Sequence, residues 1–175
     1  MNKLLHDRRL LNALGFGACA AMLGFAFYAE KVLHLEPCPL CMFQRVGIAL
    51  LGGVFLLAAL FHPRRAFGAR LWAVAIALTA LLPIGVAARH IWVQAQPEGS
   101  VPSCGATLDY MLEILPVLEV VRKVLSGGGE CARIDWRFLG LTMPMWVVLA
   151  CAALLVLGVW AGLREREKDS VRLSA

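Results

Sequence analysis

Residues 38–61 read CPLCMFQRVGIALLGGVFLLAALF, in which two cysteines one helical turn apart precede a long apolar run. About 20 apolar residues are enough to cross the hydrocarbon core of a bilayer as a helix. Pro39 suits the first position of a helix, which makes Cys38 its cap and places Cys41 in the first turn. The stretch therefore predicts a membrane-spanning helix over residues 39–61 that begins at a pair of thiols.

The whole chain has the composition of a membrane protein. Of its 175 residues, 60% are hydrophobic and only 17% are charged, whereas soluble domains average roughly 45–50% and about 25%. The excess is concentrated in four blocks, which predict spans over residues 10–29, 39–61, 71–88 and 143–163. We expect a single membrane domain, residues 1–175, that is an all-α four-transmembrane-helix bundle. The basic start of the first block is typical of a signal peptide, but the 20 residues of its apolar run exceed the roughly 7–15 of such peptides, so we expect an uncleaved span.

The basic residues indicate how the spans are oriented. Ten of the 17 fall before span one, between spans two and three, or after span four: Lys3, Arg8, Arg9, Arg64, Arg65, Arg70, Arg164, Arg166, Lys168 and Arg172. The positive-inside rule then places both termini in the cytoplasm and the loops at residues 30–38 and 91–142 outside. Basic clusters beside spans need only membrane lipid as a partner, so we expect no nucleic acid.

The second external loop has room for structure of its own. Apolar residues recur at helical spacing from Leu108 to Leu125, with charged residues between them and Pro116 in the middle. This pattern predicts a short, kinked amphipathic helix that lies on the membrane surface. Residues 126–129, SGGG, should end that helix and give Cys131 a flexible approach.

Four cysteines lie in or beside the external loops: Cys38, Cys41, Cys104 and Cys131. Outside the cytoplasm they could pair in three ways, and the sequence does not choose among them. Two structural staples are one interpretation, but a bridge between Cys38 and Cys41 closes too small a loop to stabilise a fold strongly. A helix start with a nearby cation favours a reactive thiolate instead. Cys19 and Cys151 fall inside spans, where cysteine behaves as a small apolar residue.

Arg45 follows Cys41 by four residues, so the two side chains share a helix face about 6 Å apart along the axis. It could be an arginine that snorkels to the interface. It could also stabilise the Cys41 thiolate and an oxygen of a bound quinone, the lipid-soluble two-electron acceptor of membranes. His90, at the outer end of span three, fits an interfacial residue and a redox-site residue equally well. We therefore list Arg45 and His90 as candidate cofactor-binding residues.

A metal site is the weaker interpretation of the cysteines. Zinc bound by all four is numerically possible, but Cys104 and Cys131 lack the paired spacing of a zinc ribbon. Covalent haem attachment needs a histidine after the second cysteine, and Met42 stands there. We accordingly predict no metal ligands.

The chain resembles the bacterial disulfide bond formation protein B (DsbB) family over nearly its whole length. The matching residues are EPCPLC at 36–41, Arg45, Cys104, GECA at 129–132, Trp136, FLGL at 138–141, Met143-Pro144 and Trp146. The resemblance implies a four-helix bundle in the bacterial inner membrane. Its function would be to reoxidise a periplasmic thioredoxin-like dithiol oxidase of the DsbA type.

The resemblance also implies roles for the cysteines. Cys104 and Cys131 would form the disulfide that reduced DsbA attacks, with the mixed disulfide at Cys104. Electrons would then pass to Cys38 and Cys41 through a transient bridge between Cys38 and Cys131. Cys41 would deliver them to ubiquinone, or to menaquinone without oxygen.

In the same family comparison, Arg45 matches the quinone-site arginine, and His90 matches a histidine near the quinone. Two alternatives remain. One is a quinone reductase of the vitamin K epoxide reductase type, although that family typically places its CxxC pair late in the chain. The other is a non-catalytic membrane scaffold whose loops are held by disulfides or zinc.

Overall fold

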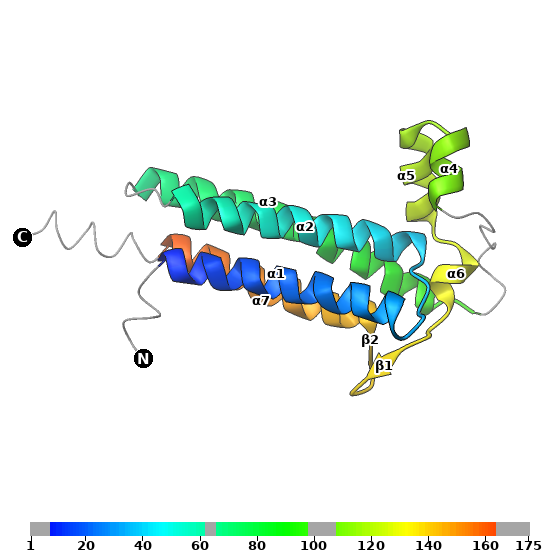
Figure 1. Cartoon of the computed structure of the whole chain (residues 1–175). Helices are drawn as coiled ribbons and strands as arrows, with labels where there is room; N and C mark the ends of the chain where they lie inside the picture. The colour runs from blue at the N-terminus through cyan, green and yellow to red at the C-terminus, as the bar shows by residue number, and fades with distance from the viewer. Residues whose placement is uncertain (1–7, 62–65, 98–107, 164–175) are drawn as a thin grey trace, which may run out of the picture.

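The protein is built on four long helices that run side by side. The computed structural model describes residues 8–61, 66–97 and 108–163, and Figure 1 shows the course of the chain. The long helices are α1 (Arg8–Lys31), α2 (Pro39–Phe61), α3 (Ala66–Gln94) and α7 (Met143–Leu163). All four are long and apolar enough to cross a membrane. The prediction of an all-α membrane protein with four transmembrane helices is confirmed.

Some of the helices extend beyond the apolar blocks from which they were predicted. α2 covers residues 39–61 as expected, whereas α3 extends past both ends of the predicted 71–88 segment. Its last turns contain Arg89 and His90. A hydropathy pattern ends where charged residues begin, but the helix continues because those side chains meet polar partners at the bundle end. This extra length carries His90 into the site described below.

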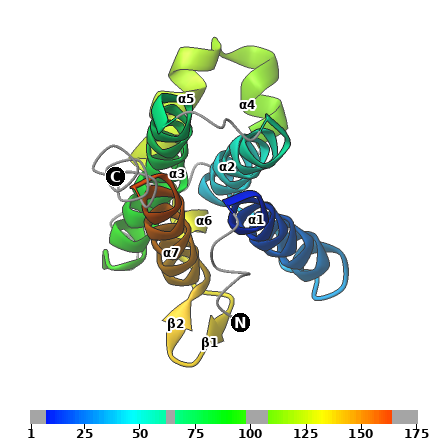
Figure 2. The same cartoon turned by 90° about the vertical axis from the view of Figure 1, so that its left-hand side faces the viewer.

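Figure 2 shows the bundle along its axis. α1 packs on α2, α2 on α3 and α3 on α7, while α1 and α7 share less contact. Gly47 of α2 lies against Pro83 of α3: a Cβ at residue 47 would come 3.0 Å from the proline ring. Small residues permit such close helix packing in membranes, where dispersion replaces the hydrophobic effect. The mid-bundle core consists of Cys19, Ile48, Leu51, Phe55, Ile76, Ala80, Cys151 and Leu154.

The remaining elements gather at the end of the bundle away from the start of α1 (Figure 1). They are α4 (Leu108–Ile114), α5 (Val117–Ser126), α6 (Gly129–Ala132) and an antiparallel ribbon of β1 (Arg137–Phe138) and β2 (Leu141–Thr142). The expected single kinked helix is therefore two helices, because Pro116 has no backbone N–H with which to continue α4. The ribbon was not predicted, since two-residue strands are too short to show an alternating pattern.

The helix pair α4–α5 presents apolar side chains both outward and inward. Val117 and Leu118 are 69% and 81% exposed, as suits a surface that meets lipid. The inward side chains form a second core with residues of α2, α3 and α6: Leu40, Val93, Met111, Val120, Val124 and Cys131. This core seats Cys131 directly over the start of α2.

Candidate active site

The first half of the site is the beginning of α2. The backbone N–H of Cys41 donates to Cys38 Sγ at 3.4 Å, so Cys38 caps the helix as predicted. The two sulfurs lie 3.0 Å apart, with the Cys38 thiol donating to Cys41. Both residues are free thiols. The sequence CPLC therefore folds locally into a dithiol at a helix start.

Cys131 supplies a third thiol from α6. It is 2% exposed, its N–H donates to the Gly128 carbonyl at 2.9 Å, and its thiol hydrogen-bonds that of Cys38. That hydrogen bond is the main reason why the pKa of Cys131 is lowered to about 6 despite burial. Interactions of the Cys38 thiol with the Cys131 and Cys41 sulfurs raise the pKa of Cys38. Cys131 is thus the thiol of this pair that ionises first.

The end of α5, which precedes Cys131, packs against α3. Gly127 ends α5 with φ of 83°, a left-handed conformation that glycine adopts without strain. A Cβ there would come 2.6 Å from Val93. Arg89 of α3 donates to the carbonyls of Leu125 and Ser126, each at 2.8 Å. The segment expected to be a flexible hinge is instead fastened to α3 in this structure.

His90 lies between the helices and α6. The imidazole is 3% exposed. Its Nδ1 lies 3.2 Å from Gln44 Nε2, and its Nε2 lies 3.1 Å from the Cys131 carbonyl oxygen. A Gln44 amide that donates to Nδ1 leaves the proton on Nε2, which can then donate to that carbonyl. Nε2 is also 3.8 Å from Cys38 Sγ, so His90 stands beside the thiols.

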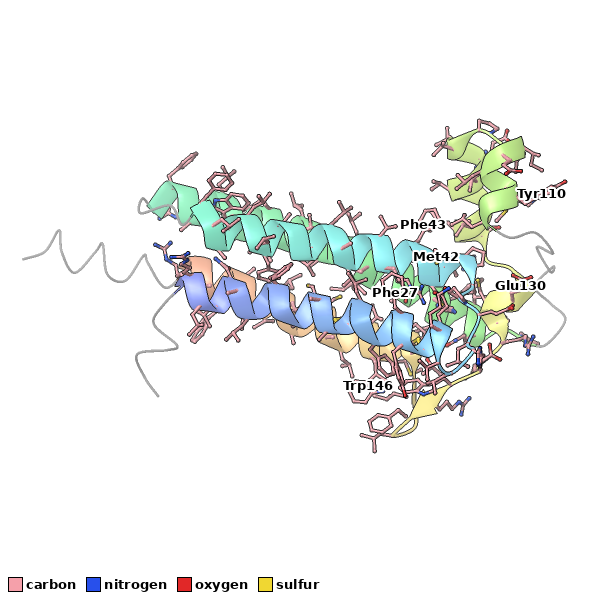
Figure 3. The ribbon with its side chains drawn as sticks, in the orientation of Figure 1. Phe27, Met42, Phe43, Tyr110, Glu130 and Trp146 are labelled. Atoms are coloured by element: carbon pink, nitrogen blue, oxygen red, sulfur yellow. The ribbon has the colours of Figure 1, made fainter. Side chains whose placement is uncertain are left out.

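Arg45 makes its contacts with α1. It forms an ion pair with Glu30, donates to the Ala26 carbonyl at 3.0 Å, and lies over the Phe27 ring at 5.3 Å. Met42 Sδ also lies 3.9 Å from Arg45 Nη1, and Figure 3 labels Phe27 and Met42 at this end of the bundle. Within the described residues, the hydrogen bonds of Arg45 go to α1 and to Met42, whereas the expected contact with the Cys41 thiolate is not among them.

A cavity of about 490 Å³ connects these groups. Its walls come from α1, α2, α3, α7 and the segment after α6. Its polar lining includes Cys38, Cys41, Gln44, Arg45, His90 and Gln94. Four lining aromatic residues lie in a row with successive ring centroids 5.7, 6.0 and 6.0 Å apart: Phe25, Trp136, Phe138 and Trp146. A mostly apolar cavity with a few convergent polar groups is typical of a small-molecule site.

The structure brings together five of the six predicted site residues. Cys38, Cys41 and His90 form one cluster, Cys131 lies beside Cys38, and Arg45 lines the same cavity as the cluster. Cys104 lies outside the described residues. Three polar neighbours were missed from sequence: Glu30, Gln44 and Gln94. A glutamine inside an apolar helix and an acid at the outer end of a span were the available signals.

Known proteins resemble this chain along nearly its whole length. The family model described as "Disulfide bond formation protein DsbB" matches residues 8–161. A disulfide bond formation protein B from Xanthomonas euvesicatoria pv. vesicatoria is 45% identical over 169 residues, which are 97% of this chain and 98% of that protein. Proteins of the same name from Xanthomonas campestris pv. campestris (strain 8004) and Xylella fastidiosa (strain Temecula1) are 46% identical over 166 residues and 41% identical over 169 residues. The alignments cover 95% and 96% of this chain, and 96% and 98% of the respective relatives.

Proposed function

The chain belongs to the disulfide bond formation protein DsbB family, and from this premise we propose that it couples the oxidation of a periplasmic dithiol protein to the reduction of a membrane quinone. The substrate is a DsbA-like thiol oxidase in its reduced form. The net reaction converts one dithiol and one quinone into one disulfide and one quinol, with two electrons and two protons transferred. The supporting observation is the row of sulfurs Cys131, Cys38 and Cys41, which ends at the cavity.

The order of the sulfurs suggests the order of the exchange steps. A thiolate of the partner attacks Cys104 in a Cys104–Cys131 disulfide, and Cys131 leaves as a thiolate. Cys131 then attacks Cys38 in a Cys38–Cys41 disulfide, which forms the Cys38–Cys131 bond and releases the Cys41 thiolate. The second thiolate of the partner resolves its mixed disulfide with Cys104, and the freed Cys104 attacks Cys131 and releases Cys38. The protein then holds a reduced Cys38–Cys41 pair, and the partner holds the disulfide.

The depressed pKa of Cys131 suits this sequence. Thiol–disulfide exchange needs an attacking thiolate, and a pKa of about 6 leaves Cys131 mostly ionised at neutral pH. Cys131 already contacts Cys38, the sulfur that it must attack. The second exchange therefore needs little movement once Cys131 is released.

The cavity fits a quinone head group. Gln94 lines the cavity. Its side-chain oxygen Oε1 is buried and, among the described groups, has no hydrogen-bond partner. A quinol hydroxyl could donate to it. When bound, a quinone supplies a two-electron acceptor that is more oxidising than DsbA-type proteins, whose potential is about −120 mV. Arg45 and His90 would orient its polar oxygens, and the aromatic row would cover its ring. We take ubiquinone as the acceptor, with menaquinone in its place without oxygen.

The proposed orientation follows from the same arrangement. The start of α1 and the end of α7 lie at one end of the bundle, and the thiols lie at the other (Figure 1). Basic residues flank the spans at the first end. This distribution supports an orientation in a bacterial inner membrane with both termini in the cytoplasm and the thiol cluster at the periplasmic surface.

The test follows quinone reduction together with cysteine oxidation. The purified full chain in lipid nanodiscs receives a reduced DsbA-type protein, with or without ubiquinone-1, and thiols are counted with a mass tag. We expect catalytic quinone reduction, and reoxidation of Cys38 and Cys41 only with quinone. Cys41→Ser should abolish both, whereas Cys151→Ala in the mid-bundle core should retain them. Cysteines that keep one redox state regardless of quinone would indicate the scaffold alternative.

A further inference from the structure

The cluster of thiols and imidazole has a second chemical capacity. Cys38 Sγ, Cys41 Sγ and one ring nitrogen of His90 all lie within 4.8 Å of one another. We propose that the reduced protein binds one thiophilic d¹⁰ cation of the Zn²⁺ class at Cys38, Cys41 and His90, with Cys131 as the fourth ligand. The bound cation would block thiol–disulfide exchange. The proposal needs the thiols to be reduced and does not depend on quinone as the acceptor.

The distances are close to those of a tetrahedral site. Zn–S bonds of about 2.3 Å and Zn–N bonds of about 2.0–2.1 Å place neighbouring ligand atoms roughly 3.5–3.8 Å apart. Cys38 Sγ and His90 Nε2 are already 3.8 Å apart. The Cys38 and Cys41 sulfurs, at 3.0 Å, need to separate by less than 1 Å. Rotation of the two cysteine side chains would provide this separation.

The fourth ligand comes from α6. The Cys131 thiol interacts with that of Cys38 but lies outside the group of donor atoms that are all within 4.8 Å of one another, so its side chain must turn toward Cys41 and His90 to complete the site. Three cysteines and one histidine form one of the common structural zinc sets. The spacing of the cysteines along the chain did not indicate this set, because the fourth donor is a histidine on another helix.

Gln44 provides the support that a metal-bound histidine needs. A ligating imidazole usually donates its other N–H to a fixed acceptor, which sets its tautomer and orientation. Gln44 Nε2 lies 3.2 Å from His90 Nδ1. If the amide rotates by half a turn, its oxygen accepts a proton from Nδ1, and the lone pair of Nε2 is free for a cation. Nε2 then gives up its contact with the Cys131 carbonyl oxygen.

The cavity beside the cluster has acidic groups in its lining. Glu36, Glu130 and Asp135 line the cavity that also exposes Cys38, Cys41 and His90. Figure 3 shows Glu130, a residue of α6, at this end of the bundle. Arg45 and Arg133 also line this cavity, and Arg133 is paired with Asp135. Glu36 and Glu130 are therefore the acidic side chains that would attract a cation toward the thiols.

Binding would depend on the redox state of the protein. A Zn²⁺ ion displaces the thiol protons and uses the sulfur lone pairs that attack a disulfide. Oxidation of Cys38 and Cys41 to a disulfide removes two ligands at once and releases the ion. The cation and the electron acceptor consequently compete for the same reduced thiols.

The test titrates Cd²⁺ into the full chain in detergent, reduced by a phosphine, freed of quinone and kept under argon. Cadmium serves as the probe because its bonds to thiolates absorb in the ultraviolet. We expect one Cd²⁺ per reduced chain and none per chain oxidised at Cys38 and Cys41. His90→Gln should weaken binding by at least about tenfold, and Cys131→Ala should also weaken it. Cys19→Ala with Cys151→Ala is the matched control and should leave the titration unchanged.

A second measurement covers the case in which a variant fails to fold. Zn²⁺ added to the reduced wild-type protein should slow alkylation of Cys38 and Cys41 at least about tenfold, reversed by a chelator. Absence of protection, or equal Cd²⁺ affinity after His90→Gln, would overturn the proposal. Both measurements omit quinone and partner, so failure of the proposed electron transfer would leave their results intact.

Discussion

The clamp between Arg89 and the end of α5 can be broken by one substitution, Arg89→Ala. The guanidinium donates to the last two carbonyls of α5, at Leu125 and Ser126, and lies 4.0 Å from the ring centroid of Trp92. Those carbonyls immediately precede the glycine turn that leads to Cys131. Loss of the clamp should therefore let the turn and α6 move away from α3 and α2 more often.

The size of the effect follows from the contacts that are lost. A hydrogen bond to a charged group contributes about 1.5–3 kcal/mol when buried, and less when solvent reaches it as it does here. An exposed cation–π contact adds about 0.5–1 kcal/mol, and a cation at a helix C-terminus adds about 0.3–1 kcal/mol. A total of about 1.5–3 kcal/mol would make local opening roughly 10- to 100-fold more frequent.

Cys131 reports that opening because its side chain is only 2% exposed. The rate at which iodoacetamide modifies Cys131 in the reduced, metal-free protein, measured by peptide mass spectrometry, should rise about 10- to 100-fold in Arg89→Ala. Arg122→Ala, on the same helix α5, is the control and should change the rate less than about threefold. Equal rates in Arg89→Ala and wild type would refute the clamp. Equal acceleration in both variants would show a general loosening of α5.

Three further predictions concern the pH dependence of Cys131 and the roles of Glu30 and Gly127. The alkylation rate of Cys131 should rise through pH of about 6, rather than near the ordinary thiol pKa of 9.0, because a lowered pKa keeps the thiolate present down to that pH. In Cys38→Ala the midpoint should move back toward 9.0, and an unmoved midpoint would exclude the Cys38 hydrogen bond as the cause. Glu30→Ala should lower the thermal midpoint in detergent by removing the counter-ion of Arg45, whose side chain is 14% exposed. Glu30→Gln retains a hydrogen-bond acceptor and should lower the thermal midpoint less than Glu30→Ala does. Equal decreases in the two variants would contradict the ion-pair explanation. Gly127→Ala should speed Cys131 alkylation about tenfold, since it adds about 1–2 kcal/mol of left-handed strain and a methyl group against α3. Gly85→Ala, at a site with open space, should not.

The spans were predictable because each depends only on local sequence. An apolar run long enough for the bilayer must be helical, since its backbone has no water to bind. The dithiol at the start of α2 was predictable for the same reason: Pro39 starts a helix, and two intervening residues place Cys38 and Cys41 within one turn. The break at Pro116 was visible too, although whether it would kink one helix or divide it in two depended on how α4 packs.

The charge partner of Arg45 was not predictable from its own helix. Spacing along α2 places Arg45 on the same helix face as Cys41. The sequence therefore predicted that Arg45 stabilises the Cys41 thiolate. In the folded protein α1 presents Glu30 and the Ala26 carbonyl to the guanidinium. A buried or half-buried cation binds the strongest acceptor within reach, and which acceptor is within reach is a property of how α1 packs on α2.

The amino-acid sequence by itself determined the four spans, their orientation signal, the CxxC dithiol and, through a resemblance of motifs, the family. Those features come from residues that are close along the chain, so composition and helical spacing suffice to find them. Only the tertiary structure decided that Cys131 contacts Cys38, that His90 of α3 joins them under the support of Gln44, and that Arg89 fastens the turn before Cys131. These contacts join residues about 40 to 90 positions apart. They exist because α2 and α3 pack side by side, and because the second apolar core packs α4, α5 and α6 against the start of α2 and the end of α3.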